Sequence, residues 1–306
     1  MNTTTTLTAN MKLYYDKLLL DNLYPEMRFY QAASKKSLPV REGRSIVWTR
    51  YRRMPARVTP LVEGVVPSVT ALSSDNISAT LHQYGDFTRV SDLLSLTAID
   101  PVLESATKEL AEAGALTIDT VIRNVLDANT NVRRVAGKAL SAMVPTDVLT
   151  GAEVRTAVRM LKAQDVRPHS GGDYLGIIHP NCSFDLQGDS AAGGWVNANT
   201  YISNLNILNG EVGKIHGVRF VESTNVSSTT GSGATVVFRN HIMGRDAFAA
   251  VPFDGTTGEA RIYVKNPGEQ DTSNPIDQFS TVGYKATFAS AILDPNRDVV
   301  LQAATA

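Results

Sequence analysis

The strongest constraint on the fold is one long amphipathic helix, which the sequence predicts from about residue 101 to 128. Asp100 is a favourable N-cap, and Pro101 occupies the first helical position, to which proline is well suited. Gly114 costs about 1 kcal/mol relative to alanine in a helix, which indicates close packing against another backbone at this point. We expect this helix to be the spine of the molecule. Its apolar or small side chains recur every three or four residues, at Leu103, Ala106, Leu110, Ala113, Thr117 and Val121, and Ile118, Ile122, Val125 and Leu126 widen the stripe.

A second constraint is the arginine-rich stretch before this helix, from Arg41 to His82. Residues 45–53 favour a strand, and alternation puts Ile46, Trp48 and Arg50 on one face. Neither face is uniformly apolar, so we do not expect this strand to line the core of its own subunit. A return strand is predicted over 78–89. A two-stranded arm is marginally stable alone, so we expect it to extend onto another chain, with Trp48 and Arg50 contacting that chain or solvent.

The second half of the chain predicts a small α/β module followed by paired strands. Residues 150–153 have the capping-box pattern and predict a helix with Val154, Ala157, Val158 and Leu161 inward. We expect Leu110, Ala113, Val121 and Val125 of the long helix to pack on strands at 259–265 and 281–293. The remaining predicted elements are a buried strand at 174–178, a helix from 180 to 186, and strands in the second half of 213–222, at 235–238, at 261–264 and at 281–293.

Composition indicates an ordinary folded protein. The 306 residues suggest about two domains, and the fractions of 43% hydrophobic and 19% charged residues are those of globular chains. The formal net charge is −1. A single cysteine, Cys182, cannot form an intrachain disulfide, which fits a reducing cytoplasm. The Thr-rich N-terminus lacks the pattern of a secretory signal, and no apolar run is long enough for a membrane span.

Little in the sequence points to catalysis or to a cofactor. Histidines lie far apart, without the spacing of a metal site. Cys182 and His179 could form a nucleophilic pair on one helical turn, near Asp185, but we favour a cysteine that packs inward. The glycine pairs match no phosphate-binding or dinucleotide-binding loop. We therefore predict no catalytic, metal or cofactor site.

The arginine run allows two interpretations. Together with Trp48 and Tyr51, it could bind single-stranded nucleic acid through phosphate contacts and base stacking. Nucleic-acid binders generally carry a basic excess, which this chain lacks, so we favour an arm that lies on an acidic surface of another subunit. The acidic first half of the long helix offers such a surface. The predicted intersubunit contacts are Arg41, Arg44, Trp48, Arg50, Arg52, Arg53, Arg57, Glu104 and Glu109.

An ordered set of short sequences carries a family resemblance. These are GRSIVWTR at 43–50, TPLVEG at 59–64, GIIHP at 176–180, GKIHGVRFVES at 213–223 and VGYK at 282–285. In this order, and with the order of predicted elements, the chain resembles tailed-phage major capsid proteins of the Hong Kong 97-type fold, which is an α+β fold. The local sequences are most similar to the coliphage N-four branch of that family.

The resemblance implies a division of the chain along the lines of that fold. The implied parts are an N-terminal arm at 1–36, an extended loop (E-loop) at 37–82, a peripheral (P) domain with the spine helix at 83–145, an axial (A) domain at 146–250, returning P-domain strands and a tip loop at 251–294, and a C-terminal tail at 295–306.

The resemblance also implies a function. The chain would be a structural, non-enzymatic subunit that assembles into hexamers and pentamers of an icosahedral shell around double-stranded DNA, without sequence-specific contacts. Its partners would be many copies of itself, a portal, a separate scaffolding protein and a decoration protein, with no membrane. It would assemble in the bacterial host cytoplasm and reside in the virion capsid. The alternatives are a nucleic-acid-binding module that uses Arg41–Arg57 and a small α/β hydrolase-like enzyme.

Overall fold

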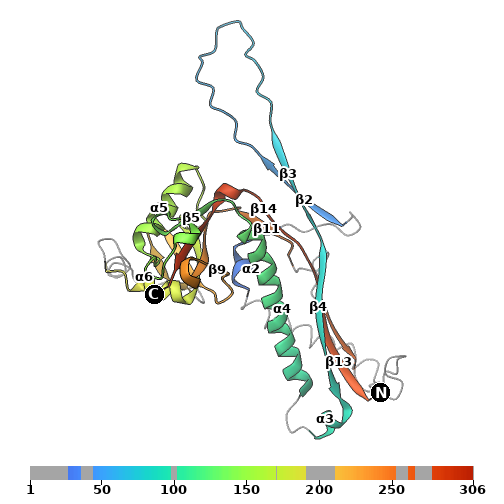
Figure 1. Ribbon diagram of the computed structural model, residues 1–306. Helices are drawn as coiled ribbons and strands as arrows, with labels where there is room; N and C mark the ends of the chain where they lie inside the picture. The colour runs from blue at the N-terminus through green and yellow to red at the C-terminus, as the bar shows by residue number, and fades with distance from the viewer. Residues whose placement is uncertain are drawn as a thin grey trace.

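The computed structural model of the protein describes residues 27–35, 44–97, 102–169, 171–190, 211–252, 261–265 and 278–305. The α-helices of the described residues are α2 (Arg28–Ala32), α3 (Asp92–Thr97), α4 (Val102–Asp127), α5 (Gly151–Ala163) and α6 (Pro180–Gln187). A lobed body carries α5 and α6, the longest helix runs from it beside long strands whose far end carries α3, and a hairpin arm projects in the opposite direction (Figure 1).

The described residues form four sheets. The body sheet has the order β5–β15–β10–β6–β8–β7, with β9 paired to β10; its strands are β5 (Val132–Arg134), β6 (Tyr174–Ile178), β7 (Glu211–Ile215), β8 (Val218–Glu222), β9 (Ser228–Thr230), β10 (Val236–Met243) and β15 (Asp298–Ala304). The other sheets are β12–β13–β4, β1–β11–β14 and β2–β3; their strands are β1 (Ser34–Lys35), β2 (Ser45–Tyr51), β3 (Ser74–Thr80), β4 (His82–Ser91), β11 (Phe248–Ala250), β12 (Arg261–Lys265), β13 (Phe279–Phe288) and β14 (Ser290–Ile292).

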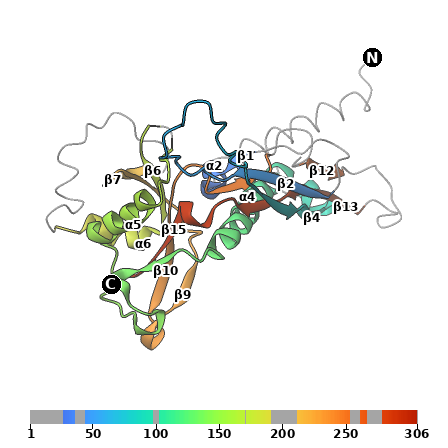
Figure 2. The same ribbon diagram turned by 90° about the horizontal axis from the view of Figure 1, so that it is seen from above.

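Helix α4 is the predicted spine, and it is continuous. Viewed from above, it lies between the body sheet and the β12–β13–β4 sheet (Figure 2). It packs on β4, β13 and β14, so the expected packing on 281–293 is confirmed. Strand β12 is an edge strand of the same sheet, and its Ile262 and Val264 belong to the buried apolar cluster that includes Leu110 of the helix. The predicted close packing at Gly114 is present, but against a ring rather than a backbone: a Cβ there would lie 3.2 Å from Cε2 of Tyr284.

The buried stripe of α4 differs from the predicted one. Leu110 is buried as expected, but Ala113 is exposed and Val121 and Val125 are half-buried. Alanines occur on several sides of this helix, so their sequence spacing fits more than one stripe. Among the described residues of this helix, the buried side chains are Thr107, Leu110, Ala111, Ala115, Ile118, Asp119, Ile122 and Leu126.

The described part of the N-terminal segment packs on its own chain. The buried side chain of Asp119 on α4 accepts hydrogen bonds from the backbone N–H groups of Phe29 (2.8 Å) and Tyr30 (3.3 Å) in α2. Burial raises the pKa of Asp119 to about 6, against the lowering effect of these hydrogen bonds and of the one from Asn225. Residues 1–26 lie outside the described ranges, so the N-terminal arm at 1–36 stays a prediction.

The C-terminal segment is not a tail. Strand β15 lies between β5 and β10 in the body sheet, parallel to the first and antiparallel to the second. All seven of its residues are buried. Their nearly continuous apolar run is typical of a strand covered on both faces. The predicted tail at 295–306 is therefore wrong for 298–304.

Helix α5 was predicted with the correct inward face, since Val154, Ala157, Val158 and Leu161 are all buried. Its predicted capping box is wrong. Thr150 occupies the N-cap position but makes no side-chain cap bond. The carboxylate of Glu153 instead pairs with Arg133 (Nε–Oε2, 3.1 Å), which ties α5 to β5.

The predicted return strand of the arm is divided in two. Strand β3 pairs with β2 over its whole length, while β4 leaves the arm and pairs with all ten residues of β13. Leu81, the single residue between β3 and β4, is buried. The arm therefore continues directly into the sheet beside the spine helix.

Candidate assembly interface

The root of the hairpin arm packs on its own subunit. Ile46 and Trp48 in β2 are only 1% and 6% exposed. They belong to an apolar cluster with Ala249, Ala289 and Ala291 from the β1–β11–β14 region of the body. The expectation that Trp48 contacts another chain or solvent is therefore wrong. The predicted alternation is correct, since Ile46, Trp48 and Arg50 lie on one face of β2. The apolar part of this face packs on the body, and Arg50 lies further out along the arm.

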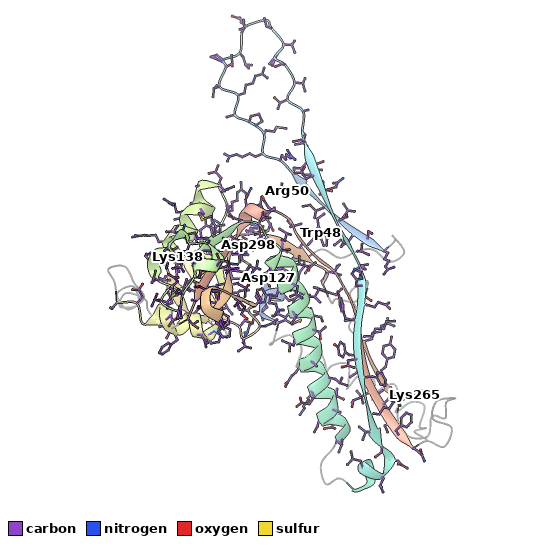
Figure 3. All side chains as sticks on the ribbon, viewed as in Figure 1. Trp48, Arg50, Asp127, Lys138, Lys265 and Asp298 are labelled. Atoms are coloured by element: carbon purple, nitrogen blue, oxygen red, sulfur yellow. The ribbon has the colours of Figure 1, made fainter. Side chains whose placement is uncertain are left out.

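Arg50, next on the same face, joins both arm strands to the body. Its guanidinium pairs with Asp75 in β3 (3.1 Å) and with Asp294 after β14 (2.8 Å), and its Nη1 donates to the carbonyl of Leu293 (3.1 Å). Hydrogen bonds from Arg52 and Arg50 lower the pKa of Asp75. Figure 3 places Trp48 and Arg50 at the root of the projecting arm.

The other predicted arginine contacts have partners within the chain. Arg52 pairs with Asp75 (2.8 Å), and Arg53 reaches Asp165 after α5 (2.6 Å). Arg57 donates to the carbonyl and hydroxyl of Ser68 across the arm. Their proposed contact with a neighbour stays a prediction, as does that of Arg44, whose Nε donates to the carbonyl of Leu81 (3.4 Å). Arg41 lies outside the described residues.

Beyond its root, the arm exposes apolar side chains. Every residue from 52 to 73 is exposed, and this stretch contains neither a helix nor a strand. Val69 is 95% exposed, and Val58 and Val66 are each 88% exposed. Irregular connections of this length are uncommon in compact domains and are usually functional. Exposed apolar surface of this extent marks an interaction site. The apolar side chains that are at least half exposed are Val58, Leu61, Val62, Val65, Val66, Val69 and Leu72.

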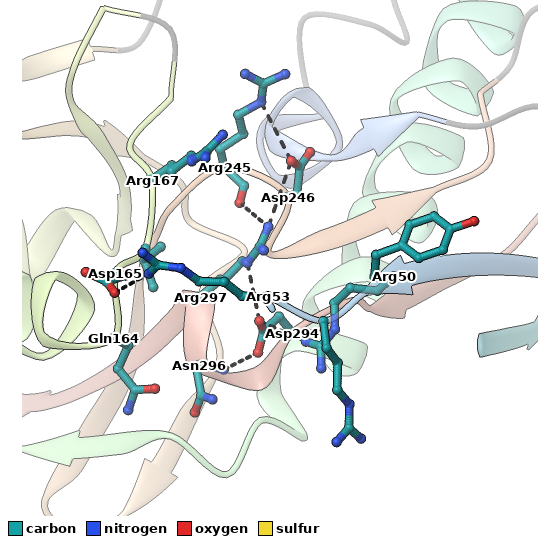
Figure 4. A pocket seen from close by; sticks show the side chains of 13 residues that line it. Arg50, Arg53, Gln164, Asp165, Arg167, Arg245, Asp246, Asp294, Asn296 and Arg297 are labelled. Carbon is teal, nitrogen blue, oxygen red and sulfur yellow. Dashed lines mark hydrogen bonds and ion pairs between the residues drawn. The ribbon is translucent and has the colours of Figure 1, made fainter. Parts of the chain in front are cut away.

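A groove of about 940 Å³ lies where the arm leaves the body (Figure 4). Six arginines and three aspartates line it, so its charge is positive but mixed. Three of the arginines, Arg167, Arg245 and Arg297, come from the body rather than from the arm, and sequence reasoning did not single them out. They are far from the arginine run in sequence, and only the fold brings them to it.

The acidic candidates lie on the first half of α4. Glu104 is half-buried and Glu109 is exposed. Glu109 and the exposed Glu112 line a second hollow of about 660 Å³ beside Glu222, and Arg28 is the one basic residue among its described lining residues. This hollow is therefore a negatively charged surface on a different part of the molecule from the arginine groove.

The residues of the hydrolase alternative do not form a nucleophilic site. Cys182 is fully buried, and burial raises the pKa of its thiol to about 12, so it stays protonated at neutral pH. The side chain of His179 caps α6, where its Nδ1 accepts from the N–H of Asn181 (3.2 Å). Within the described ranges, no three His, Cys, Asp or Glu side chains converge as metal ligands. Among the described helices, none has the length and apolar character needed to cross a bilayer.

A buried histidine joins the spine helix to the body sheet. His241 in β10 is 0% exposed; its Nδ1 is 3.1 Å from Asp298 in β15, and its Nε2 is 3.3 Å from Asp127 at the end of α4. Burial alone would lower the pKa of His241, but the charges and hydrogen bonds of Asp298 and Asp127 raise it to about 9. The imidazole is therefore charged at neutral pH and holds the two carboxylates together. Figure 3 labels both aspartates where α4 enters the body.

Comparison with known families decides the identity. A family model described as phage capsid protein matches residues 75–297. The chain belongs to this family. The predicted function as a major capsid protein, a structural component of a bacteriophage virion, is confirmed, and the nucleic-acid-binding and hydrolase alternatives are not favoured. No curated protein matches the sequence.

Solved phage capsids have the same fold as this capsid protein. The capsid of Ralstonia phage GP4 is 15% identical, with a TM-score of 0.68 over 90% of this chain and 87% of that one. The capsid of cyanophage P-SCSP1u is 13% identical, with a TM-score of 0.66 over 90% of this chain and 87% of that one. The capsid of cyanophage Pam1 is 13% identical, with a TM-score of 0.66 over 92% of each chain. The predicted α+β fold of the Hong Kong 97 type is confirmed, whereas the placement in the N-four branch stays a prediction.

Proposed function

We propose that this capsid protein assembles with many copies of itself into the pentamers and hexamers of an icosahedral phage shell. The observation that carries the proposal is the exposed apolar arm at 52–73. Its apolar side chains would lie on a neighbouring copy. This burial would stabilise the assembly by about 25 cal/mol for each Å² of apolar area removed from water. The arm is thus the E-loop of the subunit, and the predicted E-loop at 37–82 contains its anchored root.

We also propose how the remaining parts correspond to capsid domains. Helix α4 with the β12–β13–β4 sheet is the P-domain, and the body sheet with α5 and α6 is the A-domain. The continuity of the body sheet supports moving β5 (132–134) and β15 (298–304) into the A-domain. The predicted P-domain at 83–145 would lose residues 132–134, and the predicted A-domain at 146–250 would gain them together with 298–304.

The same proposal covers the contents and partners of the shell. The shell encloses double-stranded DNA without sequence-specific contacts, and the near-neutral net charge of −1 suits a container that does not grip its contents. The subunit is structural rather than enzymatic. Its further partners are a portal, a separate scaffolding protein and a decoration protein, and it assembles in the host cytoplasm before residing in the virion.

Paired substitutions in the arm test the assembly role. Val62→Asp with Val66→Asp should leave a folded subunit, because neither side chain contributes to the core, but should abolish shells, because each docked arm would bury two unpaired charges. Light scattering and negative-stain microscopy would measure assembly, and circular dichroism would monitor folding. Val236→Asp, at a 49% exposed position of the body, is the matched control. Normal shells from the arm variant would refute the proposed role of the arm.

A further inference from the structure

Two arginines in the groove at the arm root are available for a partner. Arg167 is exposed and has no carboxylate partner among the described residues, and Arg245 pairs only with its neighbour Asp246, at 3.6 Å. The backbone N–H of Arg245 donates to the carbonyl of Arg167 (2.9 Å), so the two residues are fixed side by side. Figure 4 shows both guanidinium groups on the same side of the groove. By contrast, Arg50, Arg52 and Arg53 are already paired with aspartates.

A matching pair of free carboxylates lies elsewhere on the chain. Glu109 and Glu112 are exposed on α4, one turn apart, so they extend from the same side of the helix. In the described part of the chain, neither carboxylate has an ion-pair partner. The arginine pair and the carboxylate pair line different hollows of one subunit. A contact between them therefore joins two copies of the chain.

We propose that Arg167 and Arg245 of one copy bind Glu109 and Glu112 of the next copy. The contact rests on the proposed self-assembly and adds to it a definite pair of surfaces. It is heterologous, because each copy contributes a different face, and contacts of this kind form closed rings when the rotation between copies closes. Arginine favours such a site, because its planar fork matches a carboxylate in a two-bond geometry.

The groove fits a carboxylate-bearing protein surface better than nucleic acid. Asp165, Asp246 and Asp294 are interspersed with its arginines. A phosphate backbone carries regularly spaced negative charge along its whole length, so some of that charge would face these aspartates. Two carboxylates on one helix turn can instead meet only the two arginines, and Arg28 beside them offers the aspartates a cation. The contact would also select the register between copies, since like charges facing each other are unfavourable.

A charge swap tests the contact. Arg167→Glu with Arg245→Glu should raise the protein concentration at which shells form by about tenfold or more, and Glu109→Arg with Glu112→Arg should do the same. Combining all four substitutions restores opposite charges at every copy of the contact, so assembly should return. Arg155→Glu with Arg159→Glu, on the exposed face of α5, is the control of equal charge change and should assemble normally. Circular dichroism would show that each variant is folded.

The outcomes separate this contact from the assembly role itself. If unmodified protein forms shells and the Arg167/Arg245 variant does so equally well, the contact is refuted while the assembly role stands. Failure of the four-fold variant to recover would also refute the contact. Normal assembly combined with reduced binding of double-stranded DNA would assign the groove to nucleic acid instead. If unmodified protein forms no assembly at all, the proposed function fails, and this contact fails with it.

Discussion

Arg50 in strand β2 and Asp294, which follows β14, form an ion pair with an Nη1–Oδ2 distance of 2.8 Å. It joins the arm to a part of the chain that is remote in sequence, and both side chains are more than two-thirds buried. Together with the apolar contacts of Trp48, this pair makes the arm root part of the body. The direction in which the arm leaves the body is therefore set within one subunit.

Removing this ion pair should loosen the arm root without unfolding the body. Arg50→Ala leaves Asp294 without the Arg50 contact and should lower the free energy of local opening at β2 and β3 by about 1–3 kcal/mol. Hydrogen exchange measured by mass spectrometry would show faster exchange in 45–51 and 74–80. The control is Arg57→Ala, which removes contacts only within the arm. Unchanged exchange in the Arg50 variant would mean that the apolar cluster alone holds the root.

The two sides of helix α4 should respond differently to substitution. Leu110→Ala removes a buried side chain and should lower the free energy of unfolding by about 2–5 kcal/mol. Leu110→Asp should give no soluble, assembly-competent subunit, because it buries an unpaired charge. Ala113→Asp lies on the exposed side and should change stability by about 0.5 kcal/mol or less. Urea denaturation would measure Leu110→Ala and Ala113→Asp, and the soluble yield would measure Leu110→Asp. Equal effects at 110 and 113 would contradict the observed orientation of the helix.

Gly85 should be intolerant of any side chain. A Cβ at this position in β4 would lie 2.5 Å from the carbonyl oxygen of Tyr284 in the paired strand β13, and backbone cannot move away without breaking the pairing. Gly85→Ala should therefore destabilise the subunit by about 1–3 kcal/mol. Gly188→Ala is the control, because its Cβ would meet neighbours only at ordinary contact distances, 3.5 Å or more. Thermal unfolding would compare the two, and a stable Gly85 variant would contradict the β4–β13 register.

Stability should fall as the solution becomes alkaline. The pKa of His241 is about 9 in the folded protein and 6.5 as a free side chain, so the folded state binds more protons between these values. The stabilisation is complete below pH 6.5 and is lost as the pH rises through 9. Urea midpoints measured from pH 6 to 9.5 would show the decline. Asp298→Asn should flatten it, because one of the charges that raise the pKa is removed. A midpoint independent of pH over this range would refute the buried imidazolium.

Local sequence patterns predicted individual elements well. The helix start at Pro101, the inward face of α5 and the strand at 174–178 all depend on residues close together in the chain. These features follow from capping, helical period and a short apolar run, which do not require a partner segment. The structure confirms α5 and β6, and it confirms α4 from residue 102 onward.

Long-range packing was harder to predict. Trp48 looked unpaired because the alanines that cover it, such as Ala249 and Ala291, lie about two hundred residues later and carry no distinctive signal. The apolar run at 298–304 could be a strand or a tail until β5 and β10 are seen on both sides of it. Arg167 and Arg245 reach the arginine groove only through the fold. Burial and charge pairing between remote segments cannot be inferred from spacing along the chain.

The central place of β15 has a consequence for how the protein is made. Strands β5 and β10 precede it in the chain by more than 50 residues, and neither can be fully paired until β15 has been synthesised. Until then both have an unpaired edge, which is prone to wrong pairing with other chains. During synthesis, the arm is therefore made long before β15 completes the body sheet. Production of many copies at once would favour chaperones that shield these edges during the interval.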